Sequence, residues 1–159
     1  MKKLQDLLSY LKTPATLQKA GLKILPEKIY GAPVEGDPVW NGDLSADGFY
    51  PLEHVYRAQI DFDEAQGDIE VLLTLIYCWL QENDSHREQL PAETIEWTGE
   101  PFDDGTSDVS IRLWFQDVSH FKAVAAGAGN FVYQGLEYSK ADSTPEQPTN
   151  VGQVTGAMK

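Results

Sequence analysis

The sequence predicts an α+β fold, in which a small central antiparallel or mixed sheet of about four strands packs against one long helix and an N-terminal helix. Two runs of alternating residues, over 54–62 and 109–116, predict strands. A wide apolar stripe between residues 69 and 80 predicts a helix buried against them. The 159 residues suit one domain, and a hydrophobic fraction of 42% can supply its core. We expect that domain to cover residues 1–139.

The first segment predicts an amphipathic helix. Its leucines form one stripe with spacing i, i+3, i+4 and i+7: Leu4, Leu7, Leu8 and Leu11. Neither a long apolar run nor a small-residue cleavage site follows the lysines, so we do not expect a signal peptide. Pro14 ends this helix or begins a second short one over residues 15–25, because proline lacks the N–H that a helix interior needs.

A long loop is expected over residues 31–51. Four prolines and four glycines lie between residues 26 and 51, interspersed with aspartates and asparagine. Such punctuation is typical of turns and loops. Three aromatic residues, Trp40, Phe49 and Tyr50, lie within it, so we expect this loop to pack on the domain or on a partner.

The central strand and helix follow this loop. Along HVYRAQIDF, residues 54–62, apolar residues at even positions alternate with mainly polar residues at odd positions. The helix is expected over residues 64–82, with Asp63 and Gln66 as a capping pair or Asp68 as an alternative start. Cys78, the one cysteine, is expected to be a small buried residue of this helix.

Two further strands, over residues 94–98 and 109–116, are expected to pair as a hairpin across an acidic turn. A last strand is expected over residues 131–138, interrupted at Gly135. Beyond Lys140 the chain is rich in Ser, Thr, Pro, Gln and Asn and nearly lacks large apolar residues. Residues 140–159 are therefore predicted to form a flexible C-terminal tail.

The net charge of −13 is unevenly distributed. Residues 1–30 hold six lysines and two acids, a net of +4, whereas residues 31–117 hold twenty acids and three arginines, a net of −17. An ordinary solvated surface would account for this, as would a protomer whose basic N-terminus meets an acidic face on a neighbour. An acidic face that imitates nucleic-acid phosphates is a further alternative.

No pattern of catalytic or ligand-binding residues is found. The three histidines are widely spaced, and Gly127 and Gly129 lack the spacing of a phosphate-binding loop. Asp103, Asp104 and Asp108 could bind a cation, but Asp and Gly are also the ordinary residues of turns, so we favour a turn. We therefore expect no enzyme activity, cofactor or metal. Phosphate repulsion argues against nucleic acid, and the longest apolar run, 71–80, is too short for a membrane span.

Four aromatic residues are candidates for a protein interface: Trp40, Tyr50, Trp97 and Trp114. Trp40 and Tyr50 belong to the expected loop, and Trp97 lies in a short strand that could form a sheet edge. Trp114 interrupts the polar face of its strand, so it is an interface residue or, if the sheet is covered on both faces, ordinary core. Large aromatic residues are enriched at interface centres.

Taken in order, these elements resemble a phage protein family. An N-terminal helix, a loop, a YRAQIDF strand that leads into an acid-flanked apolar helix, and an IEW…DVSIRLWFQD hairpin resemble the R-type tail completion protein of contractile-tailed bacteriophages. In plan the chain is similar to tail terminators generally. The resemblance spans residues 55–121, and the segment 31–51 and the tail depart from the family.

This resemblance implies a structural protein of the virion, with no catalytic residues. It implies a homohexameric ring that caps the tail tube, with tube and sheath proteins and the head–tail connector as further partners. The protein would assemble in the host bacterial cytoplasm, from a phage or prophage, and end in the virion tail. Two other classes remain open: an acidic inhibitor or immunity-type module that binds a basic enzyme, and an enzyme with an unrecognised site.

Overall fold

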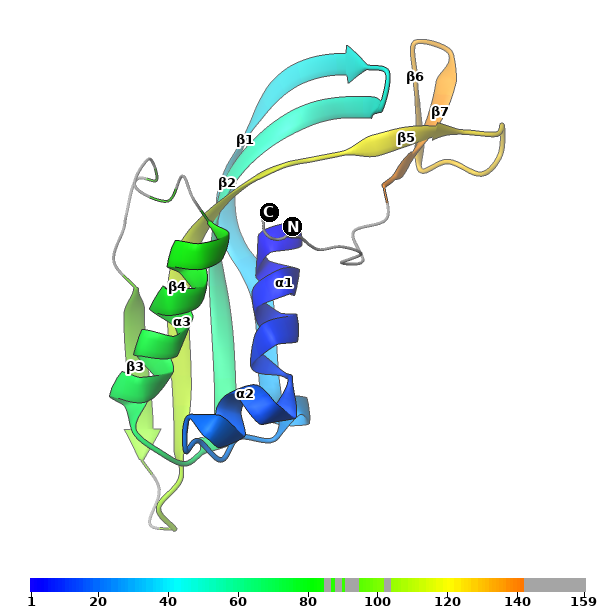
Figure 1. Ribbon diagram of the computed structural model, residues 1–159. Coiled ribbons are helices and arrows are strands. Elements are labelled where there is room, and N and C mark those ends of the chain that lie inside the picture. Colours follow the sequence, from blue (N-terminus) through cyan, green and yellow to red (C-terminus); the bar gives the residue numbers. More distant parts are fainter. Residues whose placement is uncertain (85–86, 88–89, 91–94, 102–103, 142–159) are drawn as a thin grey trace. The chain divides into compact units, whose positions relative to one another are not determined.

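The computed structural model describes residues 1–84, 87, 90, 95–101 and 104–141. The chain divides into two compact units. The first comprises Met1–Gly36 and Tyr56–Phe115, and the second comprises Asp37–Val55 and the chain from Gln116 onward. Two long strands, β1 (Ile29–Ser45) and β2 (Gly48–Ala65), each run through both units (Figure 1).

Among the described residues the fold is mostly β, with 51% in strands and 27% helical, so the expected α+β plan of about four strands on one long helix is wrong. The described strands form one seven-stranded sheet, in which six pair in the order β3-β4-β2-β5-β7-β6 and β1 pairs with β2 off this path. The expected loop over 31–51 is also wrong, because β1 and β2 occupy it apart from the turn at residues 46–47. Pro33 and Pro38 are tolerated in β1, which pairs on one side only.

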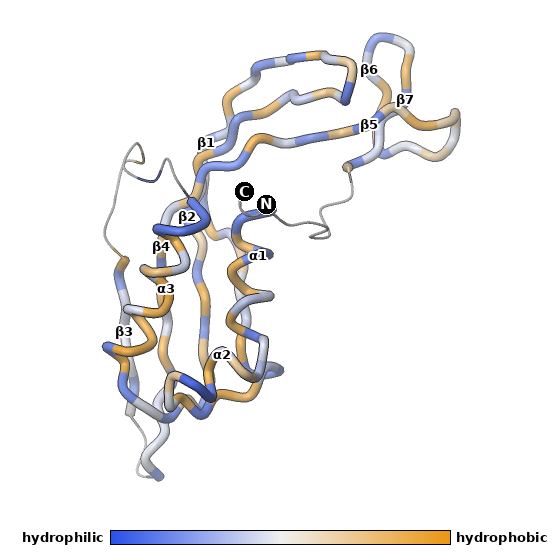
Figure 2. The backbone as a smooth tube through the Cα atoms, in the orientation of Figure 1, coloured by the Kyte–Doolittle hydropathy of each residue, from blue (hydrophilic) through white to orange (hydrophobic). Residues whose placement is uncertain are grey.

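In the first unit, helices cover one face of the strands (Figure 1). These helices are α1 (Lys2–Leu11), α2 (Pro14–Lys19) and α3 (Ile69–Asn83), with a 3-10 turn, η1, at Pro26–Lys28. The four-leucine stripe of α1 is buried, as its spacing predicts. It packs with the even-numbered residues of β2 and with the α3 residues Leu72, Ile76 and Leu80 in one core. Figure 2 shows the apolar positions of α1 and α3 in orange.

Helix α3 has 15 residues and begins later than the expected start at residue 64. The reason is that β2 continues to Ala65, and Asp68 then caps the helix by accepting a hydrogen bond from the Glu70 N–H at 2.9 Å. Cys78 is exposed on α3, so its expected burial is wrong.

The expected hairpin is present as β3 (Glu96–Pro101) and β4 (Ser107–Val118), paired antiparallel with Trp97 opposite Ile111. In β4 the buried residues are Val109, Ile111, Leu113 and Phe115, as their alternation predicts.

The second unit contains no helix among its described residues. Besides the ends of β1 and β2 it contains β5 (Phe121–Val124), β6 (Phe131–Tyr133) and β7 (Leu136–Lys140). Strand β7 pairs antiparallel with both β5 and β6. The expected strand over 131–138 is thus a hairpin, which turns at Gln134 and Gly135 with φ of 50° and 81°. Lys140 closes β7, and the rest of the expected tail from residue 142 lies outside the described residues. The single domain expected over residues 1–139 stays a prediction beside the division into two units.

Candidate interaction surfaces

The second unit is organised around a cluster of aromatic rings. Phe49 is its centre, only 1% exposed, and its ring stacks on Tyr133 with a centroid distance of 4.9 Å and an interplanar angle of 5°. Tyr138 lies 5.1 Å and Trp40 lies 6.0 Å from the Phe49 centroid. Phe131 contacts the cluster through Phe49, Phe121 and Tyr138. Rings from β1, β2, β5, β6 and β7 thus form the core of this unit.

Trp40 is the exposed rim of that cluster. Its side chain is 58% exposed, although it makes edge contacts with both Phe49 and Tyr133. Gly42 lies beneath the indole, and a Cβ there would lie 3.0 Å from the Trp40 Nε1 atom. These neighbours hold the ring in place and leave part of it in solvent. An aromatic side chain that is ordered before binding loses little conformational entropy at an interface.

Other apolar residues of β1 are exposed besides Trp40. Val34, Val39 and Leu44 are each about half exposed. Among the described strands β1 pairs only with β2, so its other edge presents free backbone N–H and C=O groups. An exposed strand edge with outward apolar side chains is a surface on which another chain can pack.

The end of the β1–β2 hairpin is acidic. We call residues 37–55 the acidic tip, since they contain four acids and no lysine or arginine: Asp37, Asp43, Asp47 and Glu53. Asp37 and Asp43 are exposed and form no ion pair within the described part of the chain.

Tyr50, the second interface candidate, stabilises the turn of the tip. Its hydroxyl donates to the Asp47 carboxylate at 2.9 Å, and its ring stacks on His120 with a centroid distance of 4.4 Å. His120 Nε2 lies 3.0 Å from the Asp47 carbonyl oxygen. Hydrogen bonds from Ser45 and Tyr50 lower the pKa of Asp47 below its ordinary value. The partners of Tyr50 give it a structural task in the turn, and its interface role stays a prediction.

A second carboxylate stabilises the glycine-rich segment after β5. The N–H groups of Gly127 and Gly129 each donate to the Glu137 carboxylate at 2.7 Å. These two hydrogen bonds lower the pKa of Glu137. A Cβ at Gly129 would lie 2.9 Å from a Glu137 oxygen, so glycine is required there. The N–H groups of Gly127 and Gly129 could bind an anion, but the Glu137 carboxylate already accepts both of their hydrogen bonds.

In the first unit, Trp97 lines a cavity at the edge of the sheet. Because Trp97 lies opposite Ile111, its side chain is on the helix-covered face, yet it is 47% exposed. The ring lies over Gly99, where an added Cβ would be 3.2 Å away. Together with residues that include Ile69, Leu72 and Val109 it lines a cavity of about 310 Å³.

Trp114 lies on the other face of the same sheet. It is half-buried, between the inward-facing Leu113 and Phe115, and is not part of the main core. Its backbone carbonyl accepts a hydrogen bond from Arg87 at 2.6 Å. The described helices cover the opposite face, so Trp114 does not lie in a second helix-covered core. Its role as an interface residue stays a prediction.

That uncovered face is polar and its groups are largely paired with one another. Arg57 forms ion pairs with Glu35 and Glu96. Arg112 donates to Gln59 at 3.0 Å, and Ser110 donates to Asp61 at 2.6 Å. The acids here are therefore not a continuous unpaired surface.

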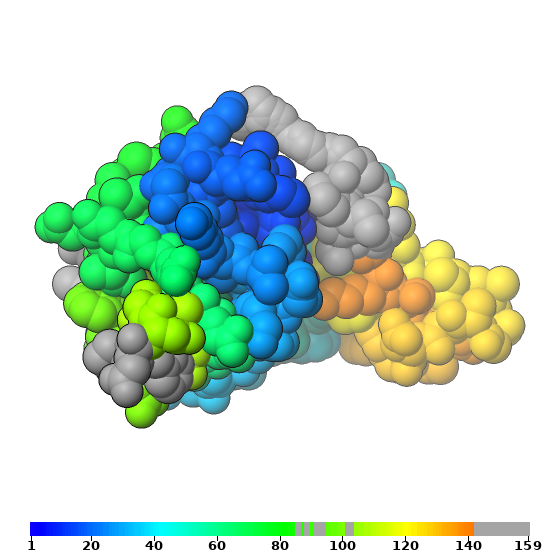
Figure 3. All heavy atoms as spheres, turned by 90° about the horizontal axis from the view of Figure 1, so that it is seen from below, coloured from blue at the N-terminus to red at the C-terminus, as the bar shows by residue number. Residues whose placement is uncertain are grey.

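The α2–η1 end of the first unit is basic. We call residues 12–28 the basic end, since they contain four lysines and the single acid Glu27. Lys28 pairs with Glu64 at 3.4 Å, whereas Lys12, Lys19 and Lys23 form no ion pair with any described residue. Figure 3 looks onto the first unit from below, where the N-terminal segment (blue) forms much of the visible surface.

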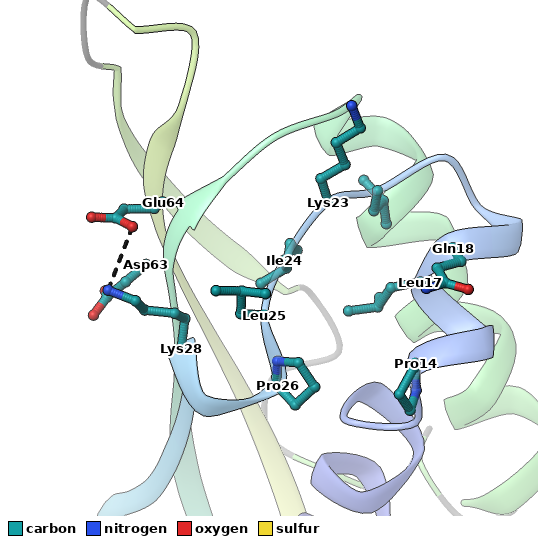
Figure 4. A pocket seen from close by; sticks show the side chains of 11 residues that line it. Pro14, Leu17, Gln18, Lys23, Ile24, Leu25, Pro26, Lys28, Asp63 and Glu64 are labelled. Atoms are coloured by element: carbon teal, nitrogen blue, oxygen red, sulfur yellow. Dashed lines mark ion pairs between the residues drawn. The ribbon is translucent and has the colours of Figure 1, made fainter.

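The basic end contains a second cavity of about 310 Å³ (Figure 4). Its apolar lining includes Leu17 of α2, Leu25 and Pro26, whose side chains surround the opening. Lys23 and the Lys28–Glu64 pair lie at its wall. Leu25 is itself more than half exposed.

Chemical sites of other kinds are not found in the described residues. No group of three or more His, Cys, Asp or Glu side chains there is arranged to hold a metal ion. Of the predicted cation candidates, Asp104 accepts hydrogen bonds from Thr106 and Asp108 accepts one from the Glu64 N–H, while Asp103 lies outside the described residues. None of the described helices has the length and apolar character needed to cross a membrane.

Comparison with known proteins identifies one family. The model of the family described as P2 phage tail completion protein R (GpR) matches residues 1–142. None of the curated proteins and none of the solved structures compared with the chain matches it. The match covers most of the chain, including both strand-rich units, and extends beyond residues 55–121, where the sequence resemblance is apparent. It supports a role in completing a phage tail, a place in the virion tail, contact with other tail components and a structural rather than catalytic protein.

Proposed function

The chain belongs to the family of P2 phage tail completion protein R (GpR), and we propose that it completes the tail as a homohexameric ring that caps the tail tube and contacts the head connector. The observation that supports a ring most strongly is the edge of β1 that pairs with no described strand, together with the exposed apolar residues of this strand. Val34, Val39, Trp40 and Leu44 are all exposed along this strand.

Ring formation requires two different surfaces on each copy, because every copy contacts one neighbour on each side. The β1 edge supplies one surface, with backbone groups for strand pairing and an ordered indole for packing. The opposite charges of the acidic tip and the basic end give a reason for two unlike surfaces to meet. Copies that associate in this way would bury side chains that are otherwise exposed.

Other partners follow from the same proposal. A ring at the end of a tail touches the tube and sheath proteins on one side and the head connector on the other. It would assemble in the host bacterial cytoplasm, from a phage or a prophage genome, before it is incorporated in the virion.

The polar face of the first unit favours this role over an acidic inhibitor of a basic enzyme. Such an inhibitor needs unpaired carboxylates along one surface to attract a cationic target. Glu35 and Glu96 are instead paired with Arg57. The unpaired acids of the tip occupy a strand end that also exposes Trp40 and Leu44, which suits packing against another protein surface.

A deletion and complementation experiment tests the proposed function. The gene is removed from a phage or prophage that produces particles, and the lysate is examined by electron microscopy. We expect unjoined heads and tails, with joined particles restored by the wild-type chain, and a hexameric ring in averaged images of the isolated tail end. Normal joined particles in the deletion strain, or a tail end without copies of this chain, would contradict the proposal.

A further inference from the structure

The acidic tip and the basic end lie in different units of the chain and carry opposite, unpaired charges. Asp37 and Asp43 of the tip are exposed without an ion pair in the described part of the chain. At the basic end, Lys12, Lys19 and Lys23 likewise form no ion pair with any described residue. Charges left unpaired within one molecule are available to a neighbour, and exposed charges of opposite sign guide association.

The two surfaces also differ in shape. Leu44 lies beside Asp43, next to the turn that ends the β1 strand, and is 52% exposed. The cavity of the basic end is concave and lined by Leu17, Leu25 and Pro26 (Figure 4). Its volume of about 310 Å³ is near the lower limit for small-molecule pockets, which suits a single large side chain.

We propose that the acidic tip of one copy docks on the basic end of the next copy, with Leu44 in the cavity and Asp43 facing Lys23. This inference rests on the proposed ring and specifies the contact that builds it. The cavity lining contains Lys23 and Lys28 together with Asp63 and Glu64, and Lys28 pairs with Glu64. Lys12 and Lys19 of the same basic end add positive charge that attracts an incoming aspartate.

A contact of this kind joins two unlike surfaces, so each copy offers a tip to one neighbour and a cavity to the other. Such head-to-tail contacts close into rings or extend as filaments. A second copy is favoured as the occupant because both complementary surfaces belong to this chain. A tube or connector protein in the cavity is the alternative outcome of the test.

Reversed charges provide the test. One variant, K19E/K23E, reverses the charge of two unpaired lysines of the basic end, and a second variant, D37K/D43K, reverses the two unpaired aspartates of the tip. In each variant alone, the reversed side chains meet side chains of the same sign on the neighbouring copy, so we expect self-association to weaken at least tenfold by sedimentation of the full-length chain at low salt. In an equimolar mixture the lysines at 37 and 43 can meet the glutamates at 19 and 23, while the aspartates of the other variant meet Lys19 and Lys23, and association should return to the wild-type level.

A matched control is E82K/E100K, which changes the net charge by the same amount as D37K/D43K at exposed positions outside both surfaces. It should associate like wild type. L44A should weaken association tenfold in wild type and in the mixture of variants, with an unchanged thermal melting curve.

The outcomes separate this contact from the ring itself. If wild type associates and the charge variants associate equally well, or if the mixture fails to restore association, the proposed contact is wrong while a ring through another surface stands. Wild type that remains monomeric at every concentration, but binds purified tail tubes through the tip, would overturn the self-contact and assign the tip to the tube.

Discussion

The two units of this chain are stabilised in different ways. The first has a mainly aliphatic core, with a minority of aromatic residues, in which α1 and α3 cover the even-numbered residues 56–62 of β2. The second has no described helix and a core of stacked rings around the buried Phe49. The stability that a leucine stripe provides depends on the apolar area it removes from water. The stability of the ring cluster also depends on a few well-oriented contacts between rings. We therefore expect the second unit to be more sensitive than the first to the loss of one residue.

The largest expected effect is that of Phe49→Ala. Removal of a buried phenylalanine costs about 3–5 kcal/mol, and here it also removes the ring on which Tyr133 stacks. Hydrogen exchange should accelerate across β5, β6 and β7 while α1 and α3 keep their protection. Val132→Ala, at an exposed position of the same unit, is the control. Equal loss of protection in both units would show that they unfold together and would remove the distinction.

Leu7→Ala tests the other side of the comparison. Leu7 is fully buried in the stripe of α1, and a cavity there should cost about 2–5 kcal/mol of the free energy of unfolding. Chemical denaturation followed by far-ultraviolet circular dichroism measures it, with Val71→Ala on the outer side of α3 as the control. The first unit should lose protection from exchange in this variant. A change below 1 kcal/mol would mean that the leucine stripe is not what stabilises this unit.

Trp40→Ala should separate stability from association. Because the indole is 58% exposed, the change in folding free energy should stay below about 1 kcal/mol. Self-association should weaken by about 2 kcal/mol, roughly 30-fold, if the indole is a central interface residue. Sedimentation measures the association, and Leu136→Ala provides an equally exposed control in the same unit. If Trp40→Ala associates as strongly as the wild type, Trp40 is not an interface residue.

The smallest effect concerns pH. The pKa values of Asp47 and Glu137 are lowered in the folded chain by the hydrogen bonds they accept. Their contribution to stability is therefore fully present above the unfolded pKa and is lost as the pH falls through the lower folded values. Both groups are in the second unit, so exchange there should accelerate first below about pH 4. The variant D47N/E137Q should reduce this difference between the units, and an unchanged pH profile would contradict the assignment.

Local patterns predicted the elements whose burial follows a simple period. The leucine spacing of α1 and the alternation of Val109, Ile111, Leu113 and Phe115 in β4 are both confirmed. Each of these elements packs one face against a single core, so periodicity is enough to find it. The family resemblance is also confirmed, and the match extends it to residues 1–142.

Strand β1 and the first part of β2 could not be predicted in the same way. Proline and glycine in residues 26–51 are typical of a loop, but a strand that pairs on one side can contain them. The short strand β5 was not predicted, because its four residues show little alternation and acquire order by pairing with β7. The ring cluster also escaped prediction, since Phe49 meets Tyr133 and Tyr138 only after the strands have paired.

The four candidate interface residues also show what residue type predicts and what only the fold reveals. Trp40 and Trp97 are half exposed, whereas Tyr50 stabilises a turn and Trp114 lies on the uncovered polar face of the sheet. Residue type alone identifies large aromatic side chains that suit an interface. The ring on which Tyr50 stacks belongs to His120, which comes from a distant part of the chain.

The sequence by itself determined the leucine helix, the alternating strands, the separation of basic and acidic segments and the resemblance to a tail completion family. These properties depend on residue order and composition, which local physics can interpret. Only the tertiary structure decided that residues 31–51 are strands, which aromatic rings are buried, and that a cavity opens at the basic end. Each of these depends on how strands and segments pack against one another, and such packing follows from the fold as a whole and not from a local pattern.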